Sequence, residues 1–459
     1  MGGPLSKAKP MTRRDPGALA QPTPFGPAGP LRGTAAIPGD KSITHRALML
    51  AAMARGRSRI EGAADGSDLH STAVALEAMG VGIARDGHAW TVEGVGTGCL
   101  LQPARALDMG NSGTSARLLM GLVASHRITA AFTGDASLCR RPMDRVIAPL
   151  RRIGAEVTAS PGGRLPLMVR GLCPAVPRST RLTIASAQVK SALLLAGLNI
   201  PGLTEIVEPV ATRDHTERLL ALFRAEIELD EQAGERRIAL RGEAELRPQQ
   251  VSVPGDPSAA AFLIVAALIV PGSEVRIEGV GVNPMRTGLF DTLRDMGAEL
   301  VVSNRREQSG EPVADVVARS SALRGIEVPP AAIPAMIDEF PIFFVAAAFA
   351  EGESRTSGLA ELRIKESDRI AAMAEGLRAI GAEVGESDDG LVIGGSGGAA
   401  LAGGAAIASE LDHRIAMSFA VAGLHCRQPL LIDDMAPVET SFPAFEATLA
   451  GLLGHGRGR

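Results

Sequence analysis

The chain has 459 residues, of which 46% are hydrophobic and 21% are charged, and its formal net charge is -4. This length exceeds one ordinary core, so we expect two domains or one large repeat array, and the composition is that of a globular protein. The negative net charge and the scarcity of stacking aromatics, with one Trp and no Tyr, argue against a nucleic-acid partner but leave room for a local basic cleft.

Two features bear on where the protein acts. Residues 1–30 are rich in Pro, Gly, Ala and basic residues and contain no apolar run long enough for a signal-peptide core, so we expect a disordered tail. No later segment reaches transmembrane length free of charge, so no membrane partner is expected. The cysteines have no metal-binding or disulfide-framework spacing, which predicts no metal site and is compatible with the cytoplasm. They are Cys99, Cys139, Cys173 and Cys426.

The first motif is PGDKSITHR, residues 38–46, which runs into an apolar segment. We expect Ser42 to cap a helix, with Ser42 and Arg46 four apart on one face. The hydroxyl, the Lys41 ammonium and the Arg46 guanidinium then converge on a helix N-terminus, where backbone N–H groups favour an anion. An ordinary capped helix with solvated charges fits this motif alone equally well.

A unit consisting of a helix end, a Gly turn and a strand start recurs along the chain. Gly at the turn fits the left-handed position after a helix. Clear copies begin at Leu76, Leu150, Leu293 and Leu377, and degraded copies begin at Leu220 and Leu449. Six copies spaced by roughly 70 to 85 residues predict six similar α/β units.

A second series of segments has nearly the same period. Each member is a polar loop followed by a helix that is apolar on nearly all faces, and such helices must be buried. The segments are residues 41–54, 111–124, 185–198, 256–269, 338–350 and 412–424. Six buried helices that open with polar residues predict that their N-termini gather at a common site.

An internal echo predicts the domain boundary. Ile37 to Ser42 reads IPGDKS, Val253 to Ser258 reads VPGDPS, and each begins a block of three units. We therefore expect a first lobe of residues 41–253 and a second lobe of residues 31–40 plus 254–459. The chain would cross between the lobes near 38–41 and 253–256. Two lobes with a double crossing usually close on a ligand, although a rigid pair remains the alternative.

The loops of the first lobe carry candidate anion-binding groups. Small residues at 110–114, including Gly113, allow a ligand to approach a helix start, or form a plain turn. Arg140 and Arg141 are a solvated pair or a phosphate or carboxylate clamp. Residues 185–191 open the third buried helix with groups that suit ring hydroxyls. Arg213 is another possible anion contact, and neighbouring His215 is more simply a structural histidine.

The second lobe carries carboxylates beside cations. Asp338 stands where a buried helix begins, as either an N-cap or a general base. Lys365 and Arg369 lie four apart, on one face if helical, and Glu366 is adjacent to Arg369. The segment 412–414, Asp-His-Arg, heads the last buried helix.

Together these motifs closely resemble the 5-enolpyruvylshikimate-3-phosphate synthase family and, within it, the glyphosate-tolerant bacterial subgroup. The resemblance covers the chain from about Arg32 onward and rests on PGDKSITHR, GNSGTSAR, RRPM, ASAQVKSALLLAGL, TRDHTE, IDEFP, KESDR and LDHRIAMSF. It implies an α/β fold of two lobes, an inside-out α/β barrel of six βαβαββ repeats, three per lobe. It also implies transfer of the enolpyruvyl group of phosphoenolpyruvate to the 5-hydroxyl of shikimate 3-phosphate through a tetrahedral intermediate, with no cofactor.

The resemblance also implies roles for individual residues. Asp338 would take the hydroxyl proton, Glu366 would protonate the methylene carbon, and Lys41 would share the acid–base work. The groups implied to hold phosphoenolpyruvate are Lys41, Gly113, Arg141, Gln188, Arg369 and Arg414. Those implied to hold shikimate 3-phosphate are Lys41, Ser42, Arg46, Ser186, Ala187, Gln188, Arg213, Asp338 and Lys365. We expect a monomer with glyphosate as an inhibitor.

Three departures and two alternatives accompany this resemblance. Many family members have a Lys just before the Thr-Phe-Pro near the C-terminus, and here the corresponding stretch is Glu439-Thr440-Ser441-Phe442-Pro443, so that contact is absent. Gly113 stands where the best-known tolerant member has Ala, and Leu118 stands where sensitive enzymes commonly have Pro, which predicts only partial glyphosate tolerance. The alternatives are enolpyruvyl transfer to UDP-N-acetylglucosamine, for which Cys139 would be the reactive residue, and a non-catalytic sugar-phosphate-binding paralogue.

Overall fold

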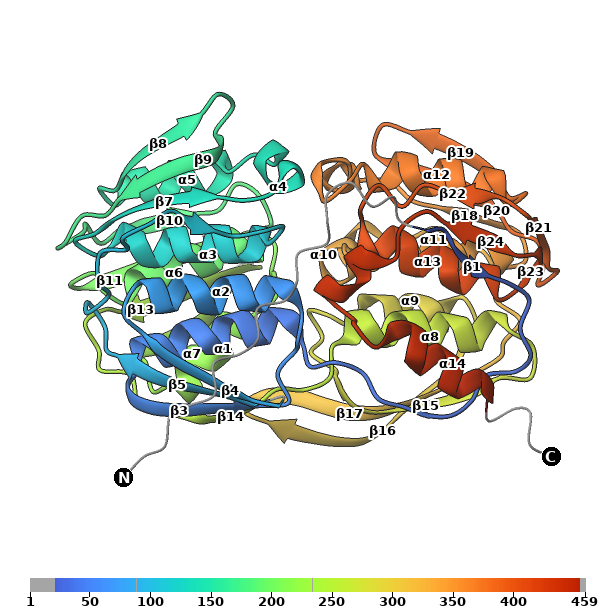
Figure 1. Ribbon diagram of the computed structural model, residues 1–459, viewed down its shortest axis with the longest axis horizontal. Coiled ribbons are helices and arrows are strands. Elements are labelled where there is room, and N and C mark those ends of the chain that lie inside the picture. The colour runs from blue at the N-terminus through green and yellow to red at the C-terminus, as the bar shows by residue number, and fades with distance from the viewer. Residues whose placement is uncertain (1–20, 88, 233, 455–459) are drawn as a thin grey trace.

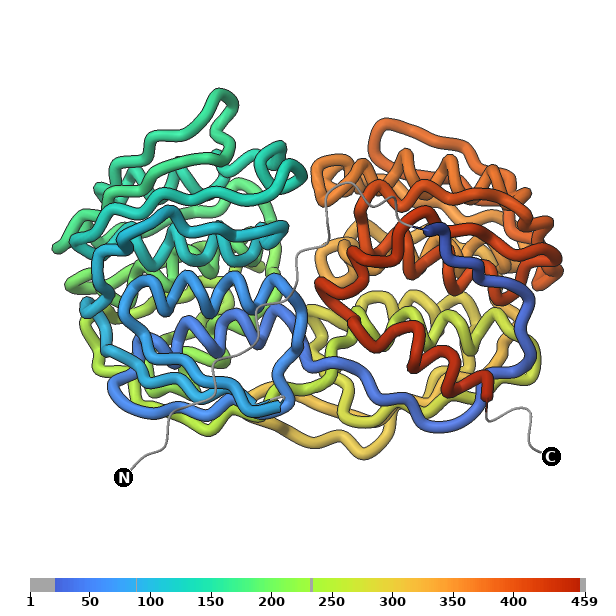
Figure 2. Tube along the Cα trace, in the orientation of Figure 1, coloured from blue at the N-terminus to red at the C-terminus, as the bar shows by residue number. Residues whose placement is uncertain are grey.

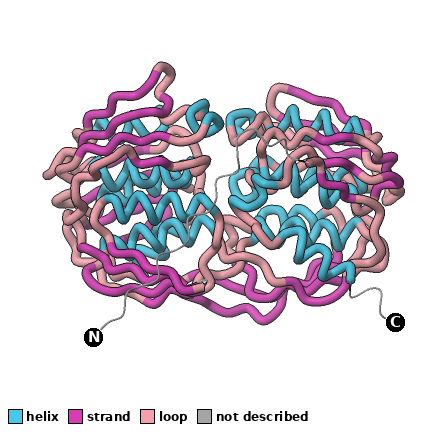
Figure 3. Tube along the Cα trace, viewed as in Figure 1, coloured by secondary structure: helices cyan, strands magenta, loops and turns pink. Residues whose placement is uncertain are grey.

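The computed structural model describes residues 21–87, 89–232 and 234–454. They form two lobes that lie side by side (Figure 1). In each lobe the helices occupy the interior and most strands lie on the outside, as Figure 3 shows by colour. This is the mixed α/β, two-lobed architecture expected from the sequence, with sheets outside a helical interior.

Six inner helices confirm the second series of segments, with shifts of a residue or two at their ends. Nearly every residue in them is buried, because apolar side chains on all faces cannot be left in water. The first lobe contains α1 (Lys41–Met53), α3 (Gly113–Ala124) and α6 (Ala187–Gly197). The second lobe contains α8 (Pro257–Ile269), α11 (Phe340–Phe349) and α13 (His413–Gly423).

Six further helices correspond to the other repeated unit. They are α2 (Ser67–Ala78), α5 (Asp144–Arg152), α7 (His215–Leu222), α9 (Gly288–Asp295), α12 (Arg369–Ala379) and α14 (Phe445–Gly454). The four clear copies of the Gly turn have positive φ, from 91° at Gly297 to 107° at Gly154. This left-handed conformation ends the helix and sends the chain into the next strand, as predicted. In the degraded copy after α7, Arg224 takes positive φ instead.

Three four-stranded sheets enclose the first lobe, and each combines one parallel pair with two antiparallel pairs. Their strand orders are β14-β3-β5-β4, β6-β7-β9-β8 and β10-β11-β13-β12. The strands are β3 (Arg55–Glu61), β4 (Gly82–Asp86), β5 (Ala89–Val95), β6 (Leu107–Asp108), β7 (Thr129–Thr133), β8 (Glu156–Ser160), β9 (Arg164–Arg170), β10 (Ser179–Arg181), β11 (Leu203–Glu208), β12 (Ile227–Gln232), β13 (Glu235–Arg241) and β14 (Gln250–Ser252). Because β14 pairs with β3, the end of this block of chain returns to its beginning.

The second lobe has one four-stranded sheet and three smaller ones. Their orders are β16-β17-β15-β2, β18-β20-β19, β1-β24-β22 and β21-β23. The strands are β1 (Thr23–Phe25), β2 (Arg32–Ala35), β15 (Glu274–Gly281), β16 (Glu299–Gln308), β17 (Glu311–Arg319), β18 (Glu353–Arg355), β19 (Glu383–Ser387), β20 (Gly390–Gly394), β21 (Leu401–Gly403), β22 (Ala406–Ile407), β23 (Cys426–Gln428) and β24 (Leu430–Ile432). Figure 2 traces the N-terminal segment along this lobe before it passes to the other.

The expected disordered tail is wrong for residues 21–30, and residues 1–20 lie outside the described part. Thr23–Phe25 pairs with β24 in antiparallel fashion, and the Ala28 amide donates to the Leu424 carbonyl at 3.0 Å. Phe25 also packs against the core of the second lobe. The composition suggested disorder, but a sheet edge offers unpaired backbone groups to any extended segment that reaches it.

Two separate hydrophobic cores match the two lobes. One contains buried residues from Ile43 to Val253, and the other contains Leu31, Ala35 and residues from Ala259 to Leu452. Among the described residues, no single helix is long and apolar enough to cross a membrane. Two consecutive helical segments, Pro330–Met336 and Phe340–Phe349, reach that length and apolar character only when they are taken together, and they are bent by 120°. Every residue of Phe340–Phe349 is buried in the core of the second lobe, which accounts for the apolar character of this helix.

The two segments that connect the lobes lie side by side. Gly39 and Gly255 form an antiparallel bridge, the Asp40 amide donates to the Pro254 carbonyl at 2.8 Å, and the Asp256 amide donates to the Pro38 carbonyl at 2.9 Å. A Cβ on Gly39 would lie 1.9 Å from the Gly62 carbonyl oxygen, so only glycine allows this approach. The pairing places the beginnings of α1 and α8 next to each other.

Candidate active site

One cleft between the lobes is lined by all fourteen candidate residues from the sequence. Ten basic and five acidic side chains line it, although the chain as a whole has a net charge of -4. The candidates are Lys41, Ser42, Arg46, Gly113, Arg141, Ser186, Ala187, Gln188, Arg213, Asp338, Lys365, Glu366, Arg369 and Arg414. Such a cleft is suited to a ligand that carries several negative charges.

The N-terminus of α1 presents Lys41 to the cleft. The prediction that Ser42 caps this helix is wrong, because the Asp40 side chain accepts from the Ile43 amide at 2.9 Å and Ser42 lies inside the helix. Lys41 Nζ lies 3.1 Å from Asp68 Oδ2 and 3.5 Å from the Thr440 carbonyl oxygen of the second lobe. The ammonium therefore lies at the junction of both lobes.

Arg46 lies one turn further along α1 and is buried. Its guanidinium donates to Thr216 Oγ1 and Ser191 Oγ, both at 2.8 Å, and to the Ser42 carbonyl at 2.9 Å. Burial, with smaller effects from nearby charges, lowers its pKa to about 10, which still leaves it charged near neutral pH. Three neutral acceptors hold the charge without cancelling it.

Asp338 lies in the turn before α11, and its carboxylate contacts cations from both lobes. Oδ2 lies 2.7 Å from Arg213 Nη2, and Oδ1 lies 3.3 Å from Lys365 Nζ and 3.7 Å from Arg369 Nη1. Arg414 donates to the Asp338 carbonyl at 2.7 Å. Burial favours the neutral acid, but Lys365, Arg213 and the other cations outweigh it and hold the pKa of Asp338 well below its usual value. Of the two uses open to Asp338, the N-cap is excluded, since Glu339 occupies that position.

Glu366 lies in the irregular segment before α12. Its carboxylate contacts Arg369 Nη2 at 2.7 Å and Arg141 Nη1 at 3.6 Å. Burial again favours the neutral form, but Arg369 and Arg141 hold the pKa of Glu366 well below its usual value. In the free protein, Asp338 and Glu366 are both ionised.

Arg369 has the densest set of acidic partners in the cleft. It donates from Nε to Asp412 Oδ2 at 2.8 Å and also contacts Glu366 and Asp338. It is 1% exposed, and these carboxylates raise its pKa despite burial. Asp412 in turn caps α13 by accepting from the Arg414 amide at 2.9 Å. The cap thus positions two of the candidate arginines.

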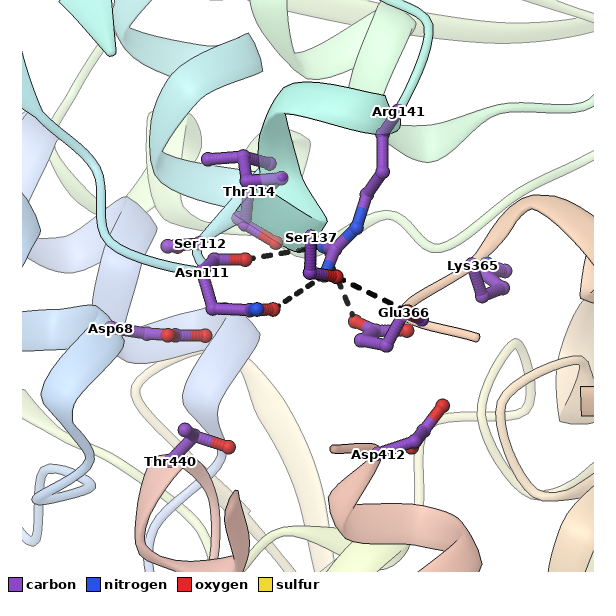
Figure 4. A network of polar contacts seen from close by, with 12 residues as sticks. Asp68, Asn111, Ser112, Thr114, Ser137, Arg141, Lys365, Glu366, Asp412 and Thr440 are labelled. Carbon is purple, nitrogen blue, oxygen red and sulfur yellow. Dashed lines mark hydrogen bonds and ion pairs between the residues drawn. The ribbon is translucent and has the colours of Figure 1, made fainter. Parts of the chain in front are cut away.

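Arg141 enters the cleft from the first lobe, as Figure 4 shows. Nη1 donates to the Asn111 carbonyl at 3.1 Å, and Nη2 donates to the Asn111 side chain and to Ser137 Oγ. The preceding residue, Arg140, is exposed whereas Arg141 is buried, so the two guanidinium groups do not form one solvated pair. Gly113 begins α3 nearby, where a Cβ would lie 2.7 Å from Arg117 Nη1 and 3.4 Å from Arg141 Nη1.

The third buried helix supplies neutral groups. Ser186 caps α6 by accepting from the Val189 amide at 3.4 Å, and Ala187 is the first helical residue. Gln188 accepts from Arg117 at 3.0 Å and donates to Thr114 Oγ1 at 3.0 Å. These contacts fix which end of the Gln188 amide faces each neighbour.

Sequence reasoning assigned no role to several residues that line the cleft. They include Asp68, Asn111, Thr114, Arg117, Arg145, Arg286, Glu361 and His413. The buried imidazole of His413 has a pKa lowered to about 3, chiefly by burial, so it is neutral. The helical spacing of Arg117 after Gly113 was a usable signal, whereas Arg286 belongs to no recognisable motif.

Two other residues considered from the sequence lie outside the cleft lining. The Cys139 thiol donates to the Gly134 carbonyl at 3.4 Å and is not part of the cleft lining. A cysteine that reacts with a bound substrate would have to face the cleft. His215 is buried, with Nδ1 2.7 Å from Glu311 Oε1 of the second lobe. The structural interpretation of His215 is therefore supported by its partner.

In the described part of the chain, no group of three or more His, Cys, Asp and Glu side chains is arranged to hold a metal ion.

Comparison with known proteins was made at the level of families, sequences and structures. Residues 26–449 match the family model described as EPSP synthase (3-phosphoshikimate 1-carboxyvinyltransferase). The 3-phosphoshikimate 1-carboxyvinyltransferases of Sphingopyxis alaskensis and Novosphingobium aromaticivorans are 63% and 58% identical to this chain, each over 94% of it and 98% of the relative.

Solved structures agree with these relatives. EPSP synthase from Acinetobacter baumannii has a TM-score of 0.83 and 42% identity over 94% of this chain and 98% of its own. The enolpyruvyl transferase NikO from Streptomyces tendae has a TM-score of 0.76 over 95% of this chain and 98% of its own, at 19% identity, which shows a shared fold alone.

Proposed function

The chain belongs to the EPSP synthase family, and from that premise we propose how its cleft performs the family's reaction. The enzyme transfers the enolpyruvyl group of phosphoenolpyruvate to the 5-hydroxyl of shikimate 3-phosphate, giving 5-enolpyruvylshikimate 3-phosphate and phosphate in the shikimate pathway to aromatic amino acids. The observation that supports this cleft as the site is its excess of basic side chains around two ionised carboxylates. Two polyanions repel each other, and buried cations offset that repulsion.

We assign shikimate 3-phosphate mainly to the first lobe. Ser42, Arg46, Ser186 and Gln188, with the Ala187 backbone, would hold it, and Arg213, Lys365 and Asp338 would complete the pocket. Lys41 would contact both substrates. Phosphoenolpyruvate would be held by Arg141, Arg369 and Arg414 at the interlobe side, assisted by Gly113 and Gln188.

In the addition step, Asp338 takes the proton of the 5-hydroxyl while that oxygen forms a bond to C2 of phosphoenolpyruvate. The electron pair of the C2–C3 double bond takes a proton from Glu366, and Lys41 would share this acid–base work. In the elimination step, phosphate leaves C2, C3 returns a proton to the Glu366 carboxylate, and the double bond re-forms. The hydroxyl proton held by Asp338 leaves with the phosphate, so both carboxyl groups return to their starting states. Atoms and charges balance without a further reactant.

Glu366 must carry a proton to act as the acid, although it is ionised in the free cleft. Phosphoenolpyruvate brings negative charge to Arg369 and Arg141, the cations that lower its pKa, so we expect binding to raise the pKa of Glu366. Because the bound-state pKa then exceeds the free-state pKa, the enzyme takes up a proton between the two values. Affinity for phosphoenolpyruvate consequently rises as the pH falls through the bound-state pKa.

Titration calorimetry in two buffers of different ionisation enthalpy measures this uptake. A shikimate 3-phosphate analogue that lacks the 5-hydroxyl would be present, so that no turnover occurs. On binding phosphoenolpyruvate, wild type should take up more protons than Glu366→Gln does, and the difference should be at most about one proton per site. Protonation of the ligand's own phosphate is the same in both proteins, so equal uptake would contradict the proposed pKa change.

We further propose that residues 41–253 form one lobe, that residues 31–40 plus 254–459, extended by β1, form the other, and that the two close on the substrates about the paired crossings at 38–41 and 253–256. The two separate cores and the Gly39–Gly255 bridge support these boundaries. We also propose a monomeric, cytoplasmic enzyme, which is compatible with a biosynthetic family and with the scattered cysteines.

We propose that glyphosate inhibits the enzyme with intermediate potency. A methyl group at position 113 would lie 2.7 Å from Arg117 Nη1 and 3.4 Å from Arg141 Nη1 and would crowd both guanidinium groups. Gly113 avoids this crowding, which favours binding of a phosphonate, whereas Leu118 departs from the Pro common in sensitive enzymes. The inhibition constant against phosphoenolpyruvate, compared between wild type and Gly113→Ala, measures this. A wild-type constant equal to that of Gly113→Ala, or equal to that of fully sensitive enzymes, would contradict it.

The direct test of the function is phosphate release from purified protein with phosphoenolpyruvate, with and without shikimate 3-phosphate. Release that requires both substrates is expected. Tight binding of shikimate 3-phosphate without release would instead favour the non-catalytic paralogue. Inactivation by alkylation of Cys139 would revive transfer to UDP-N-acetylglucosamine.

A further inference from the structure

Ser137 forms a hydrogen-bonded link between the lobes next to both Arg141 and Glu366 (Figure 4). It lies on the short helix α4 (Ala136–Arg140) of the first lobe and is buried. Its Oγ lies 3.1 Å from the carbonyl oxygen of Glu366, in the second lobe, and 3.1 Å from Arg141 Nη2. A guanidinium only donates and a carbonyl only accepts, so the single hydroxyl proton must go to Glu366.

The first-lobe end of this link is firmly held. Asp135 caps α4 by accepting from the Leu138 amide at 2.7 Å, and its other oxygen accepts from the Asn111 side chain at 2.7 Å. Asn111 in turn accepts from Arg141 with both its carbonyl and its side chain. Ser137 and Arg141 therefore keep a fixed relation to each other.

The second-lobe end is less well supported by regular structure. Glu366 lies between the 3-10 helix η2 (Ala360–Ile364) and α12, in a segment without helix or strand. Its carboxylate pairs with Arg369 of the same lobe at 2.7 Å, but its contact with Arg141 of the first lobe is longer, at 3.6 Å. A bond from Ser137 to the main chain of Glu366 thus supplies a constraint that the local fold does not.

The link uses neutral groups, which matters when an anion enters. A phosphate or carboxylate bound to Arg141 competes with the Glu366 carboxylate for the guanidinium, but it does not compete for a hydroxyl bonded to a carbonyl. The Arg141 Nε is also buried and has no hydrogen-bond partner. Ser137 can keep Glu366 in place after its ion pair with Arg141 is lost.

We propose that Ser137 is a positioning residue that fixes the distance between Glu366 and phosphoenolpyruvate bound to Arg141 in the closed cleft. The inference rests on the proposed function of Arg141 and Glu366. It assigns to α4 a role in catalysis that acts through another residue's main chain.

The experiment compares Ser137→Ala and Ser137→Thr with Ser160→Ala, a control in the same lobe whose hydroxyl donates to the Pro166 carbonyl at 2.9 Å outside the cleft lining. We expect Ser137→Ala to lower kcat about fivefold to tenfold, the value of one hydrogen bond, while shikimate 3-phosphate affinity without phosphoenolpyruvate is unchanged. In Ser137→Ala, the loss of kcat with rising pH should also begin at a lower pH than in wild type. The reason is that the freed Nη2 of Arg141 pairs with Glu366 and lowers the pKa of Glu366, the proposed acid. Ser137→Thr should restore kcat, and Ser160→Ala should change neither.

Melting temperatures separate this role from a structural one. A folded Ser137→Ala protein with the kcat and pH profile of Ser160→Ala would overturn the proposal. If Ser137→Ala does not fold, Ser137→Cys replaces it, since a thiol has nearly the same shape and is a weaker donor. Its kcat should fall in the same direction but by less, and a Ser137→Cys protein with the kcat and pH profile of Ser160→Ala would overturn the proposal. A wild type without turnover, or Glu366→Gln with full turnover, would instead refute the proposed function.

Discussion

Replacing Asp338 with Asn is expected to lower kcat by roughly 10²- to 10⁴-fold, the usual contribution of a general base. The carboxylate is ionised because Lys365, Arg213 and other cations outweigh the effect of burial. An amide of the same shape cannot take the hydroxyl proton. It also stops competing for Arg213 and Lys365, so the affinity for shikimate 3-phosphate should be unchanged or higher.

Steady-state rates and equilibrium binding of shikimate 3-phosphate measure these two effects separately. The matched control is Asp315→Asn, which removes a carboxylate paired with Arg276 and Arg306 on β17, outside the cleft lining. It should keep wild-type kcat. An Asp338→Asn enzyme within tenfold of wild type would show that another group takes the proton.

Replacing Arg286 with Gln is expected to lower the free energy of unfolding by about 3–5 kcal/mol, because it leaves buried carboxylates without their cation. Arg286 is 3% exposed and donates to Asp40 Oδ2 at 2.9 Å, Asp256 Oδ1 at 3.2 Å and Ser258 Oγ at 2.9 Å. Asp40 caps α1 and Asp256 caps α8. One guanidinium therefore joins the first residues of two inner helices in opposite lobes.

Denaturant unfolding followed by circular dichroism measures the loss. The control is Arg319→Gln, whose arginine also pairs with two carboxylates, Glu274 and Glu299, but at the surface, so at most about 1 kcal/mol is expected. Adding Asp40→Asn to Arg286→Gln should recover part of the loss, since Asn still caps a helix and one bare charge is removed. Equal losses at both arginines would contradict the argument.

The pH dependence of this loss has a definite sign. Burial opposes ionisation of Asp40, but Arg286 and other charges hold its pKa below the usual value. Asp40 thus contributes stability that is present above its unfolded-state pKa and is lost as the pH falls through its lower folded-state pKa. Without Arg286 the pKa of Asp40 rises, so the difference between wild type and Arg286→Gln should shrink as the pH falls toward 4.

Local sequence pattern was sufficient for much of the fold. The six inner helices were predicted because apolar residues on all faces require burial whatever the topology, and the Gly turns because positive φ is a property of single residues. Prediction failed where a choice depended on neighbours. Ser42 and Asp40 are both capable caps, and the backbone entering α1 favours Asp40.

The candidate site shows the same division. Its fourteen residues were found because each belongs to a short motif, and the fold brings all of them to one cleft. Ser137 was overlooked although it lies within four residues of Arg141, because its partner, the carbonyl of Glu366, is 229 residues away. Every residue has a main-chain carbonyl, so the residue type at position 366 does not indicate that its carbonyl accepts this hydrogen bond.

The sequence by itself determined the repeat, the burial of the inner helices, the turn glycines and the identity of the cationic and acidic groups, since these depend on contacts between residues close along the chain. Only the tertiary structure decided which charges meet. Arg286 pairs with Asp40 across 246 residues, Asp338 with Arg213 across 125, and β1 with a strand near the opposite end of the chain. Those pairings depend on how two separately packed lobes are placed against each other, and no periodicity within one segment encodes that placement.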